Sequence, residues 1–321
     1  MNALWLENNV IALREVPPPR KQQEAVIKIR KAGICSTDLE LVKGYYPYTG
    51  ILGHEFVGEV ISSPLPPAEE RGVRVGDRVV GEINAVCNEC EQCLNGRPTH
   101  CESRTVLGIV NRDGVFAEFT ALPIANLHRV PASVPDEMAV FTEPLAAALE
   151  IQQQVQVKPA DRVLLVGAGR LGQLIAQTLA LTGCDLHVVA RHKRQQDLLK
   201  GRGIRLISEE EIQPWRWDIV IEATGSPDGF MLARRAIRPR GTLVLKSTYK
   251  GEMNVNFSSI VVDEVVVVGS RCGPFEPALR LMESGRVDPT VLIDSEFSLG
   301  EALEAFKRAA EPGALKVLVS P

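Results

Sequence analysis

The sequence has few aromatic residues, no excess of positive charge and no long uninterrupted apolar run. Aromatic residues make up 5% of the 321 residues, and the formal net charge at pH 7 is −4. A negative balance offers no basic surface to nucleic acid or to an acidic membrane, so we expect neither partner. One of the longest apolar stretches, residues 260–268, is interrupted by Asp263 and Glu264, so we expect no membrane-spanning helix.

A secretory signal is also missing at the start, which reads MNALWLENNV and carries an acid where a signal peptide has basic residues. We therefore expect a cytoplasmic protein in a reducing environment, where disulfides are rare. The hydrophobic content of 45% and the charged content of 24% are those of a globular protein. A chain of 321 residues is long for a single core and predicts two domains.

Four of the seven cysteines are concentrated in one short segment. Cys87, Cys90, Cys93 and Cys101 follow the spacing C-x2-C-x2-C-x7-C. A pair of disulfides or a redox motif would be the alternatives, but in a reducing compartment this density favours a metal. Four thiolates complete a tetrahedral zinc shell and leave no open position, which is typical of a structural site. We predict a structural-zinc lobe at about residues 84–105.

The chain changes character near residue 143. Before it, short apolar runs separated by Gly, Pro and Asn or Asp predict a β-rich region. After it, strands alternate with helices, which indicates parallel βαβ units. The predicted strands are residues 161–166, 185–190, 218–222, 241–246 and 265–269, and the predicted helices are residues 144–157, 170–181, 195–200 and 229–237. From Pro277 onwards we expect two helices and a final strand at residues 315–319.

A glycine loop follows the first of these strands and opens a helix. It reads Gly167-Ala-Gly169-Arg170-Leu171-Gly172. In a dinucleotide site, Gly167 permits the tight turn, Gly169 lets the backbone approach the pyrophosphate, and Gly172 lets helix and strand pack closely. The helix N-terminus then offers free N–H groups to the phosphates. An ordinary strand–turn–helix is the alternative interpretation.

The next strand ends in basic residues. An NAD site usually has an Asp or Glu about 20 residues after the loop, where it binds the ribose hydroxyls. Here Arg191 lies 19 residues after Gly172 and is followed by His192, Lys193 and Arg194. These cations could pair with a 2′-phosphate, so NADP is favoured over NAD. A solvated basic surface loop is the alternative.

Several motifs in one order carry a family resemblance. They are GICSTD at residues 33–38, GHEFVG at 53–58, VGDRV at 75–79, the four-cysteine segment, EPL at 143–145 and the glycine loop. Over nearly its whole length the chain resembles the zinc-dependent medium-chain dehydrogenase/reductase family, nearer its polyol, sugar and threonine dehydrogenases than its ethanol-type members. The resemblance implies an α/β protein with a GroES-like β-rich catalytic domain (residues 1–143 and 272–321) and a Rossmann doubly wound parallel-sheet domain (144–271).

The resemblance also implies a catalytic zinc site, and so two zinc ions per chain. Cys35 and His54 correspond to zinc ligands, and Glu55 to a ligand or a carboxylate that exchanges with water. Glu143 stands where ethanol-type members have a Cys ligand and polyol-type members a Glu. Asp38 would then orient His54. Taken alone, Cys35 could be a buried thiol and Glu143 a carboxylate at a helix N-terminus.

Further roles follow from the same resemblance. Thr37 takes the position whose hydroxyl accepts the substrate proton and relays it, since its own pKa is too high for a base. Glu40 replaces a relay His of ethanol-type members, so it either continues the relay or lies on a solvated helix. The remaining positions that match cofactor contacts are Thr224, Ser270, Arg271 and Lys316.

The implied activity is hydride transfer between a small-molecule alcohol or carbonyl compound and NAD(P), with NADP favoured. The alcohol would be a polyol, a sugar or a related secondary alcohol, and the protein a homodimer or homotetramer. Two alternatives stay open. One is a zinc-independent enoyl or quinone reductase on the same fold, and the other is a non-catalytic NADP-binding regulatory protein. The aromatic segment at residues 45–48 could line a substrate wall or be a packed loop.

Overall fold

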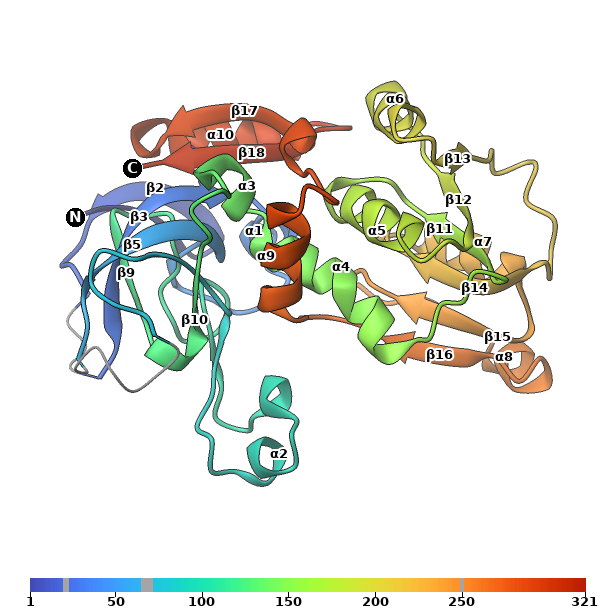
Figure 1. Cartoon of the computed structure of the whole chain (residues 1–321), viewed down its shortest axis with the longest axis horizontal. Coiled ribbons are helices and arrows are strands. Elements are labelled where there is room, and N and C mark those ends of the chain that lie inside the picture. Colours follow the sequence, from blue (N-terminus) through green and yellow to red (C-terminus); the bar gives the residue numbers. More distant parts are fainter. Residues whose placement is uncertain (20–22, 65–71, 249–250) are drawn as a thin grey trace. The chain divides into compact units, whose positions relative to one another are not determined.

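The computed structural model describes residues 1–19, 23–64, 72–248 and 251–321. They form two compact units, which we call unit 1 (Met1–Glu143 with Phe275–Pro321) and unit 2 (Pro144–Pro274) (Figure 1). The sequence placed the second boundary slightly earlier, after Arg271. None of the helices in the described part of the chain is long and apolar enough to cross a membrane.

The largest sheet of unit 1 combines strands from both ends of the chain. Its order is β10-β6-β5-β3-β18-β17, with β9 also paired to β3. These strands are β3 (Ala25–Gly33), β5 (Glu55–Ser62), β6 (Arg78–Gly81), β9 (Phe119–Leu122), β10 (Leu127–Arg129), β17 (Ile293–Ser298) and β18 (Lys316–Ser320). Because β18 is hydrogen-bonded to β3, the C-terminal segment belongs to the same core as the N-terminal one.

The strand β17 was not predicted from the sequence, which gave only helices between Pro277 and the final strand. Its sequence, IDSEFS, has no run of buried apolar residues, and none of its residues is fully buried as a whole. It forms because it pairs in parallel with β18. Pairing with a distant strand leaves little signal in the local pattern.

Two smaller sheets and several helices complete unit 1. One sheet has the order β2-β1-β4, and the other pairs β7 with β8, which come before and after the cysteine segment in the chain. These strands are β1 (Asn2–Glu7), β2 (Val10–Glu15), β4 (Gly50–Ile51), β7 (Asn84–Ala85) and β8 (Thr105–Val106). The helices are α1 (Ser36–Val42), α2 (Glu91–Leu94), α3 (Asp136–Ala139), α9 (Phe275–Glu283) and α10 (Ala302–Ala310), and the helix α4 (Thr142–Gln154) begins at the junction of the units.

The central strand β3 shows how unit 1 is packed. Ile27 and Ile29 are buried, whereas Lys28 and Arg30 between them are exposed. This period of two puts one face of the strand on the core and the other in solvent. The alternation stops at Ala32 and Gly33, which are both buried where the strand reaches the candidate metal site.

Unit 2 is a parallel sheet with the order β13-β12-β11-β14-β15-β16, as the alternating pattern predicted. Its strands are β11 (Arg162–Val166), β12 (Asp185–Val189), β13 (Arg205–Leu206), β14 (Trp217–Glu222), β15 (Ile237–Leu245) and β16 (Val266–Gly269). Its other helices are α5 (Arg170–Ala180), α6 (Lys193–Gly201), α7 (Pro227–Ala236) and α8 (Phe257–Val262). The central strands have buried side chains on both faces, which requires helices on both faces.

The chain leaves the centre of this sheet in two directions. From β11 it passes outward to β12 and β13, and from the neighbouring β14 it passes outward to β15 and β16. Right-handed crossovers therefore place α5 and α6 on one face and α7 on the other. At such a reversal, the carboxyl ends of the two central strands form a binding crevice. The predicted doubly wound fold is confirmed, and the glycine loop lies at this crevice.

Candidate metal and cofactor sites

Among the described residues of unit 1, two groups of side chains are close enough to hold a metal ion. One is the cysteine quartet, and the other consists of Cys35, His54 and Glu55. Within each group, the potential ligand atoms all lie within 4.8 Å of one another. Residues far apart in the sequence are thus gathered into the donor sets that zinc prefers.

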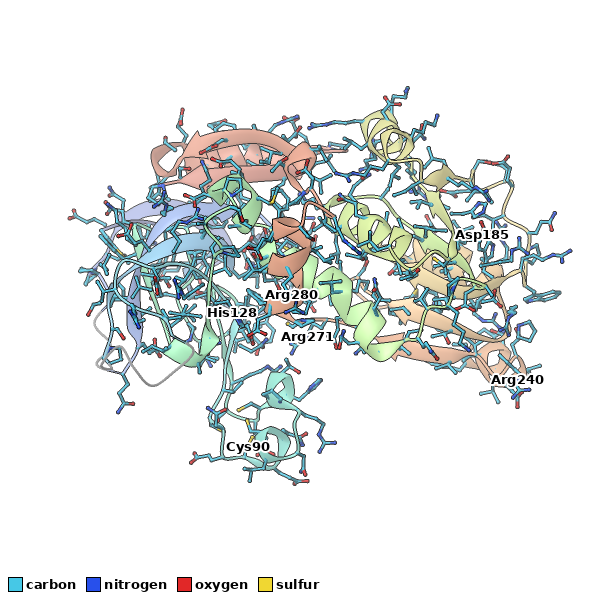
Figure 2. All side chains as sticks on the ribbon, viewed as in Figure 1. Cys90, His128, Asp185, Arg240, Arg271 and Arg280 are labelled. Carbon is cyan, nitrogen blue, oxygen red and sulfur yellow. The ribbon has the colours of Figure 1, made fainter. Side chains whose placement is uncertain are left out.

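The cysteine quartet has the geometry of a tetrahedral thiolate site. The Sγ atoms of Cys90 and Cys93 are 3.6 Å apart, and those of Cys101 and Cys87 are 3.5 Å apart. A zinc ion bound to four thiolates holds its sulfurs about 3.8 Å apart, whereas a disulfide needs about 2 Å. Figure 2 shows Cys90 in this lobe, next to the sulfur atoms of the group.

Backbone N–H groups point at these sulfurs. The N–H of Cys87 donates to Cys101 Sγ at 3.4 Å, and that of Cys90 donates to Cys87 Sγ at 3.4 Å. Hydrogen bonds, the largest from the backbone of Glu89, lower the pKa of Cys87 to about 6, and the Cys87 N–H lowers the pKa of Cys101. Burial instead raises the pKa of Cys93 to about 12. Because metal ligation requires thiolates, the donors at Cys87 and Cys101 suit a zinc site.

The second group is assembled by the register of two strands. Cys35 comes directly after the end of β3, and His54 comes directly before β5. Gly33 pairs with Glu55 across these antiparallel strands, so both ends meet at one place. Gly53 has φ +95, a left-handed conformation that suits glycine, and a Cβ there would lie 2.8 Å from the Phe116 ring. This turn directs His54 into the group.

A fully buried carboxylate, Asp38 in α1, holds two members of the group. Its Oδ2 accepts the N–H of Cys35 at 2.8 Å, and its Oδ1 lies 3.2 Å from His54 Nδ1. Burial alone would lower the pKa of His54, but the charge and hydrogen bond of Asp38 together with those of Cys35 outweigh burial and raise the pKa well above its ordinary value. A carboxylate at Nδ1 orients an imidazole so that Nε2 can bind a metal.

The third member, Glu55, is 1% exposed and forms an ion pair with Lys316, which is 2% exposed. The pair lies across Gly33, where a Cβ would be 2.6 Å from Glu55 Oε2 and 3.2 Å from Lys316 Cδ. The other carboxylate oxygen, Oε1, is buried without a hydrogen-bond partner among the described residues. An unpartnered buried carboxylate oxygen is costly unless a cation satisfies it, so this group fits a metal. The expected contact of Lys316 with the cofactor stays a prediction.

Three other residues were predicted to act at this group, and the structure places them differently. Thr37 Oγ1 is 3.7 Å from Cys35 Sγ, so its hydroxyl adjoins the group. Glu40 accepts a hydrogen bond from Lys43 Nζ at 2.8 Å. Glu143 is half-buried in the first turn of α4 and is not among the residues within 4.8 Å of one another in the described structure. The roles given to all three stay predictions.

Within the aromatic segment, Tyr48 is packed into the loop, whereas Tyr45 and Tyr46 are exposed. Its hydroxyl donates to the carbonyl oxygens of Ile51 at 2.7 Å and of Arg112 at 2.9 Å. Burial, with the charges of Asp113 and Asp38, raises the pKa of this phenol. Tyr48 therefore joins the backbone at Ile51 to the backbone at Arg112.

The glycine loop of unit 2 has the geometry that a dinucleotide needs. Gly167 has φ +105, and a Cβ on it would lie 2.8 Å from the backbone of Ala223. A Cβ on Gly172 would lie 2.2 Å from the Gly167 carbonyl oxygen, so α5 and β11 pack closely there. A Cβ on Gly169 would meet nothing within 4 Å, so there is open space beside it. Arg170 and Leu171 begin the 11-residue helix α5, whose N-terminus faces this space.

The basic residues after β12 are exposed, and one of them has a partner that sequence reasoning missed. Arg191 Nε donates to Glu209 Oε1 at 3.0 Å. Glu209 follows the short strand β13, which lies beside β12 in the sheet. A carboxylate therefore stands near the predicted 2′-phosphate site, although it comes from a neighbouring strand. Only the strand order could have indicated it.

The loop after β14 is organised by Glu222, which is 4% exposed. Its Oε1 accepts hydrogen bonds from Thr224 N at 2.6 Å, from Thr224 Oγ1 at 2.5 Å and from Gly225 N at 3.2 Å. Sequence reasoning used Glu222 only as the end of a strand. A buried carboxylate that accepts several hydrogen bonds fixes the loop that contains the predicted cofactor contact Thr224.

The ends of β15 and β16 are joined by a buried lysine that sequence reasoning also missed. Lys246 Nζ donates to Ser270 Oγ at 3.1 Å and to the Arg271 carbonyl oxygen at 2.7 Å. Ser270 and Arg271 are predicted cofactor contacts. Only the parallel pairing of β15 with β16 brings Lys246 to them.

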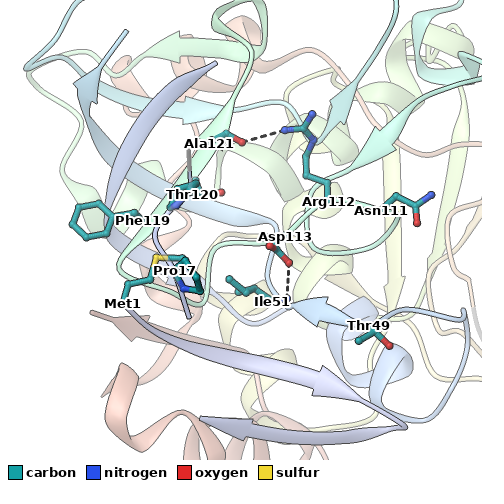
Figure 3. A pocket seen from close by; sticks show the side chains of 11 residues that line it. Met1, Pro17, Thr49, Ile51, Asn111, Arg112, Asp113, Phe119, Thr120 and Ala121 are labelled. Carbon is teal, nitrogen blue, oxygen red and sulfur yellow. Dashed lines mark hydrogen bonds between the residues drawn. The ribbon is translucent and has the colours of Figure 1, made fainter. Parts of the chain in front are cut away.

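Unit 1 also has a cavity of about 440 Å³, shown in Figure 3. Its lining includes Met1, Pro17, Phe119 and Asp113, and Asp113 accepts a hydrogen bond from the Ile51 N–H at 3.1 Å. None of its lining residues belongs to either metal group. This cavity is therefore lined by other residues than those of the two candidate metal groups.

Known proteins with similar sequences and structures agree with this picture. The family model of the alcohol dehydrogenase GroES-like domain matches residues 21–132. The family model of ketopantoate reductase PanE/ApbA matches residues 163–233. A sorbitol dehydrogenase of Halalkalibacterium halodurans is 29% identical over 97% of this chain and 95% of that protein. A zinc-type alcohol dehydrogenase-like protein of Haemophilus influenzae is 30% identical over 91% of this chain and 90% of that protein.

The chain belongs to the zinc-type medium-chain dehydrogenase family. The structure of a zinc-binding dehydrogenase of Sinorhizobium meliloti 1021 bound to NADP matches with a TM-score of 0.90 and 28% identity, over 100% of this chain and 99% of that one. The expected class of activity, a zinc-dependent alcohol oxidoreductase with a nicotinamide cofactor, is confirmed, as is the GroES-like and Rossmann fold. The two alternative activities are not favoured.

The buried ion pair between Glu55 and Lys316 gives a stability prediction for this dehydrogenase. Lys316→Met should lower the free energy of unfolding by about 3–5 kcal/mol, because it leaves the Glu55 carboxylate buried without its cation. The double variant Lys316→Met with Glu55→Gln should recover much of the loss. Denaturant unfolding of the three proteins measures this. A Lys316→Met variant as stable as the wild type would show that the pair does not support the sheet.

Proposed function

We propose that this dehydrogenase oxidises a polyol, a sugar or a related secondary alcohol, or reduces the corresponding carbonyl compound, with NADP as cofactor. The observation that carries the proposal is the Cys35, His54 and Glu55 group, with its unpartnered buried carboxylate oxygen. The glycine loop, with open space at Gly169, supports a dinucleotide. The similarity to a sorbitol dehydrogenase supports a polyhydroxy substrate.

In this proposal Cys35, His54 and Glu143 hold the catalytic zinc, and Glu55 serves as a ligand or gives way to water. Zinc supplies a Lewis acid that lowers the pKa of an alcohol, and the nicotinamide supplies the hydride acceptor. Asp38 keeps His54 oriented through Nδ1. The Thr37 hydroxyl takes the substrate proton and passes it on, because it adjoins Cys35 Sγ.

The Thr37 hydroxyl can be tested by a pair of variants. With NADP and a panel of polyols, sugars, threonine and larger alcohols, the wild type should turn over at least one substrate. Thr37→Val keeps the volume but removes the hydroxyl, so turnover should fall by about 10²–10⁴ with zinc still bound. Thr37→Ser keeps the hydroxyl and should stay near wild type.

Steady-state rates and zinc content are measured for the wild type, Thr37→Val and Thr37→Ser. Wild-type turnover by Thr37→Val with full zinc would mean that the proton leaves by another route. A wild type inactive on the whole panel in both directions would contradict the proposed activity itself.

We further propose two zinc ions per chain, one in each donor group. Metal analysis of the purified protein should find about two equivalents, of which one is structural. Cys93→Ser should lose one equivalent and lower the stability. Glu143→Ala should lose the other together with turnover, whereas Glu143→Cys restores a ligand of equal charge and should recover occupancy.

The variant Asn88→Gly, at an exposed residue of the same lobe, is the control that should keep both equivalents, because it changes no cysteine and glycine readily adopts the φ of 62 found there. One equivalent in the wild type would contradict the two-site proposal. Two equivalents retained in Glu143→Ala would remove Glu143 from the ligand set without affecting the cysteine site.

NADP is proposed over NAD because Arg191 and its basic neighbours replace the expected acid at the end of β12. Arg191→Asp should weaken NADP binding by about tenfold to a hundredfold, the loss of one or more charge-assisted hydrogen bonds, and should favour NAD. Arg216→Asp is the control. It makes the same charge change at the amino ends of the strands, directly before β14. Isothermal titration with NADP and NAD compares the proteins. Equal affinity of the wild type for both would contradict the preference.

We also propose that the protein forms a homodimer, or a homotetramer built from such dimers, through the free edge of the unit 2 sheet. The edge strand β16 and the adjacent helix α8 expose apolar side chains, among them Val262 at 79%, Phe257 at 71% and Val266 at 53%. An open apolar sheet edge is a ready template for pairing with a second copy.

Size-exclusion chromatography coupled to light scattering measures the oligomeric state. Val262→Glu should convert the assembly to smaller species, because it puts charge into the apolar surface. Val75→Glu, at an exposed valine of unit 1, should leave the oligomeric state unchanged. A monomeric wild type, or a Val262→Glu variant of unchanged mass, would contradict this surface as the interface.

A further inference from the structure

An ion pair joins the ends of two neighbouring strands in the sheet of unit 2. Arg191 comes shortly after β12 and Glu209 shortly after β13, and Arg191 Nε donates to Glu209 Oε1 at 3.0 Å. The two strands are parallel, so their carboxyl ends lie at the same edge of the sheet. The side chains are 64% and 39% exposed, so a ligand in solution can reach both. An ion pair this exposed contributes little to stability, and its main effect is on the charge at this edge.

The backbone of Glu209 is held by its neighbours in the fold. Just before it, the N–H of Ile207 donates to the Val188 carbonyl oxygen at 3.1 Å, which continues the pairing of β13 with β12. From α7, Arg235 Nη2 donates to the carbonyl oxygen of Glu209 itself at 3.2 Å. The carboxylate therefore stands beside Arg191 because the sheet and α7 put it there.

The place of this pair in the fold identifies the part of a dinucleotide that it meets. In a doubly wound sheet, the adenosine ribose lies at the end of the strand that follows the glycine-loop helix. Here that strand is β12, because the glycine loop joins β11 to α5. An acid at this place binds the 2′-hydroxyl of NAD, and an arginine accommodates the 2′-phosphate of NADP. This protein has both side chains, an arginine after β12 and a carboxylate after β13.

The geometry of the pair decides how the two side chains act together. Glu209 occupies the Nε side of the Arg191 guanidinium, so a phosphate would bind the terminal nitrogens with the carboxylate still in place. The phosphate and the carboxylate would then be about 5–8 Å apart, which is less than the Debye length of about 10 Å at about 0.1 M salt. A phosphate monoester carries a charge of about −1.5 to −2 at neutral pH. Glu209 therefore repels the same group that Arg191 attracts.

We propose that Glu209 is a second cofactor-specificity residue, which lowers the affinity for the 2′-phosphate and so limits the preference for NADP. Arg191 sets the direction of the preference, and Glu209 sets its size. The 2′-hydroxyl of NAD is neutral, so its binding does not depend on repulsion at this place. This inference rests on the proposed function, because it requires that the adenosine ribose lies at the end of β12.

The test measures dissociation constants by isothermal titration of the purified, zinc-loaded, full-length protein. The ligands are NADP and NAD, together with the fragments 2′,5′-ADP and 5′-AMP, which differ only in the 2′-phosphate. Glu209→Gln should tighten the binding of NADP and of 2′,5′-ADP by about three- to fivefold, as expected for one exposed charge. NAD and 5′-AMP should stay within about twofold of wild type. Glu209→Lys reverses the charge and should tighten NADP further, by about tenfold in all.

Two controls separate repulsion from other effects. Glu304→Gln removes the carboxylate of an exposed pair in unit 1, where Lys307 Nζ lies 2.7 Å from Glu304, and should leave all four constants unchanged. Raising the salt from about 0.1 M to about 1 M shortens the Debye length from about 10 Å to about 3 Å. The difference in NADP affinity between Glu209→Gln and wild type should then nearly vanish. A change of local structure would persist at high salt.

Each outcome decides for or against the inference. Unchanged or weaker NADP binding in Glu209→Gln and Glu209→Lys overturns it, because the carboxylate then only positions Arg191 or does nothing. An equal gain for NAD and NADP overturns it as well, and so does a gain that persists at high salt. A wild type that binds 2′,5′-ADP no better than 5′-AMP, with no further loss in Arg191→Asp, instead contradicts the proposed use of NADP itself.

Discussion

The ion pair between Glu55 and Lys316 is the constraint on which unit 1 and its metal group depend. It joins β5 to the last strand, β18, across a position in β3 where only glycine leaves room. A buried charge is costly unless its partner stays beside it. If the C-terminal strand left the sheet, one of the two charges would therefore be left buried without its partner. The same pair leaves Glu55 Oε1 without a hydrogen-bond partner among the described residues, and Glu55 belongs to one group with Cys35 and His54. Fold and metal group therefore share one electrostatic requirement.

Unit 2 follows a different rule, in which chemistry collects where parallel strands end. The backbone loop at Gly169, the carboxylate of Glu222 and the ammonium of Lys246 all lie at the carboxyl edge. Lys246 is held by residues at the end of a neighbouring strand, whereas Glu222 binds residues that directly follow its own strand. Glu222 fixes its loop by accepting N–H groups, and Lys246 joins two strand ends by donating. The edge thus has donors and charges fixed before any cofactor arrives, which lowers the cost of binding it.

Much of the fold and of the metal chemistry was readable from the sequence, because the signals are local. The spacing of Cys87, Cys90 and Cys93 puts three donors on one short loop, and the glycine loop marks a strand-to-helix turn. Alternating strands and helices predicted the parallel sheet. In contrast, β17 was missed because its half-exposed, polar sequence becomes a strand only by pairing with β18. The partners of Arg191 and Lys316 were missed because an ion pair between distant strands has no spacing to read.

The sequence by itself determined which donor atoms and which glycines the chain has, and therefore the classes of metal and cofactor that it can bind. Tertiary structure alone decided which donors meet. It put Glu55 and Lys316 on either side of Gly33, brought Glu209 to Arg191, and buried Lys246 at the strand ends. The physical reason is that strand order and register are set by burial of the whole sheet, whereas the identity of a ligand or a turn residue is set at its own position.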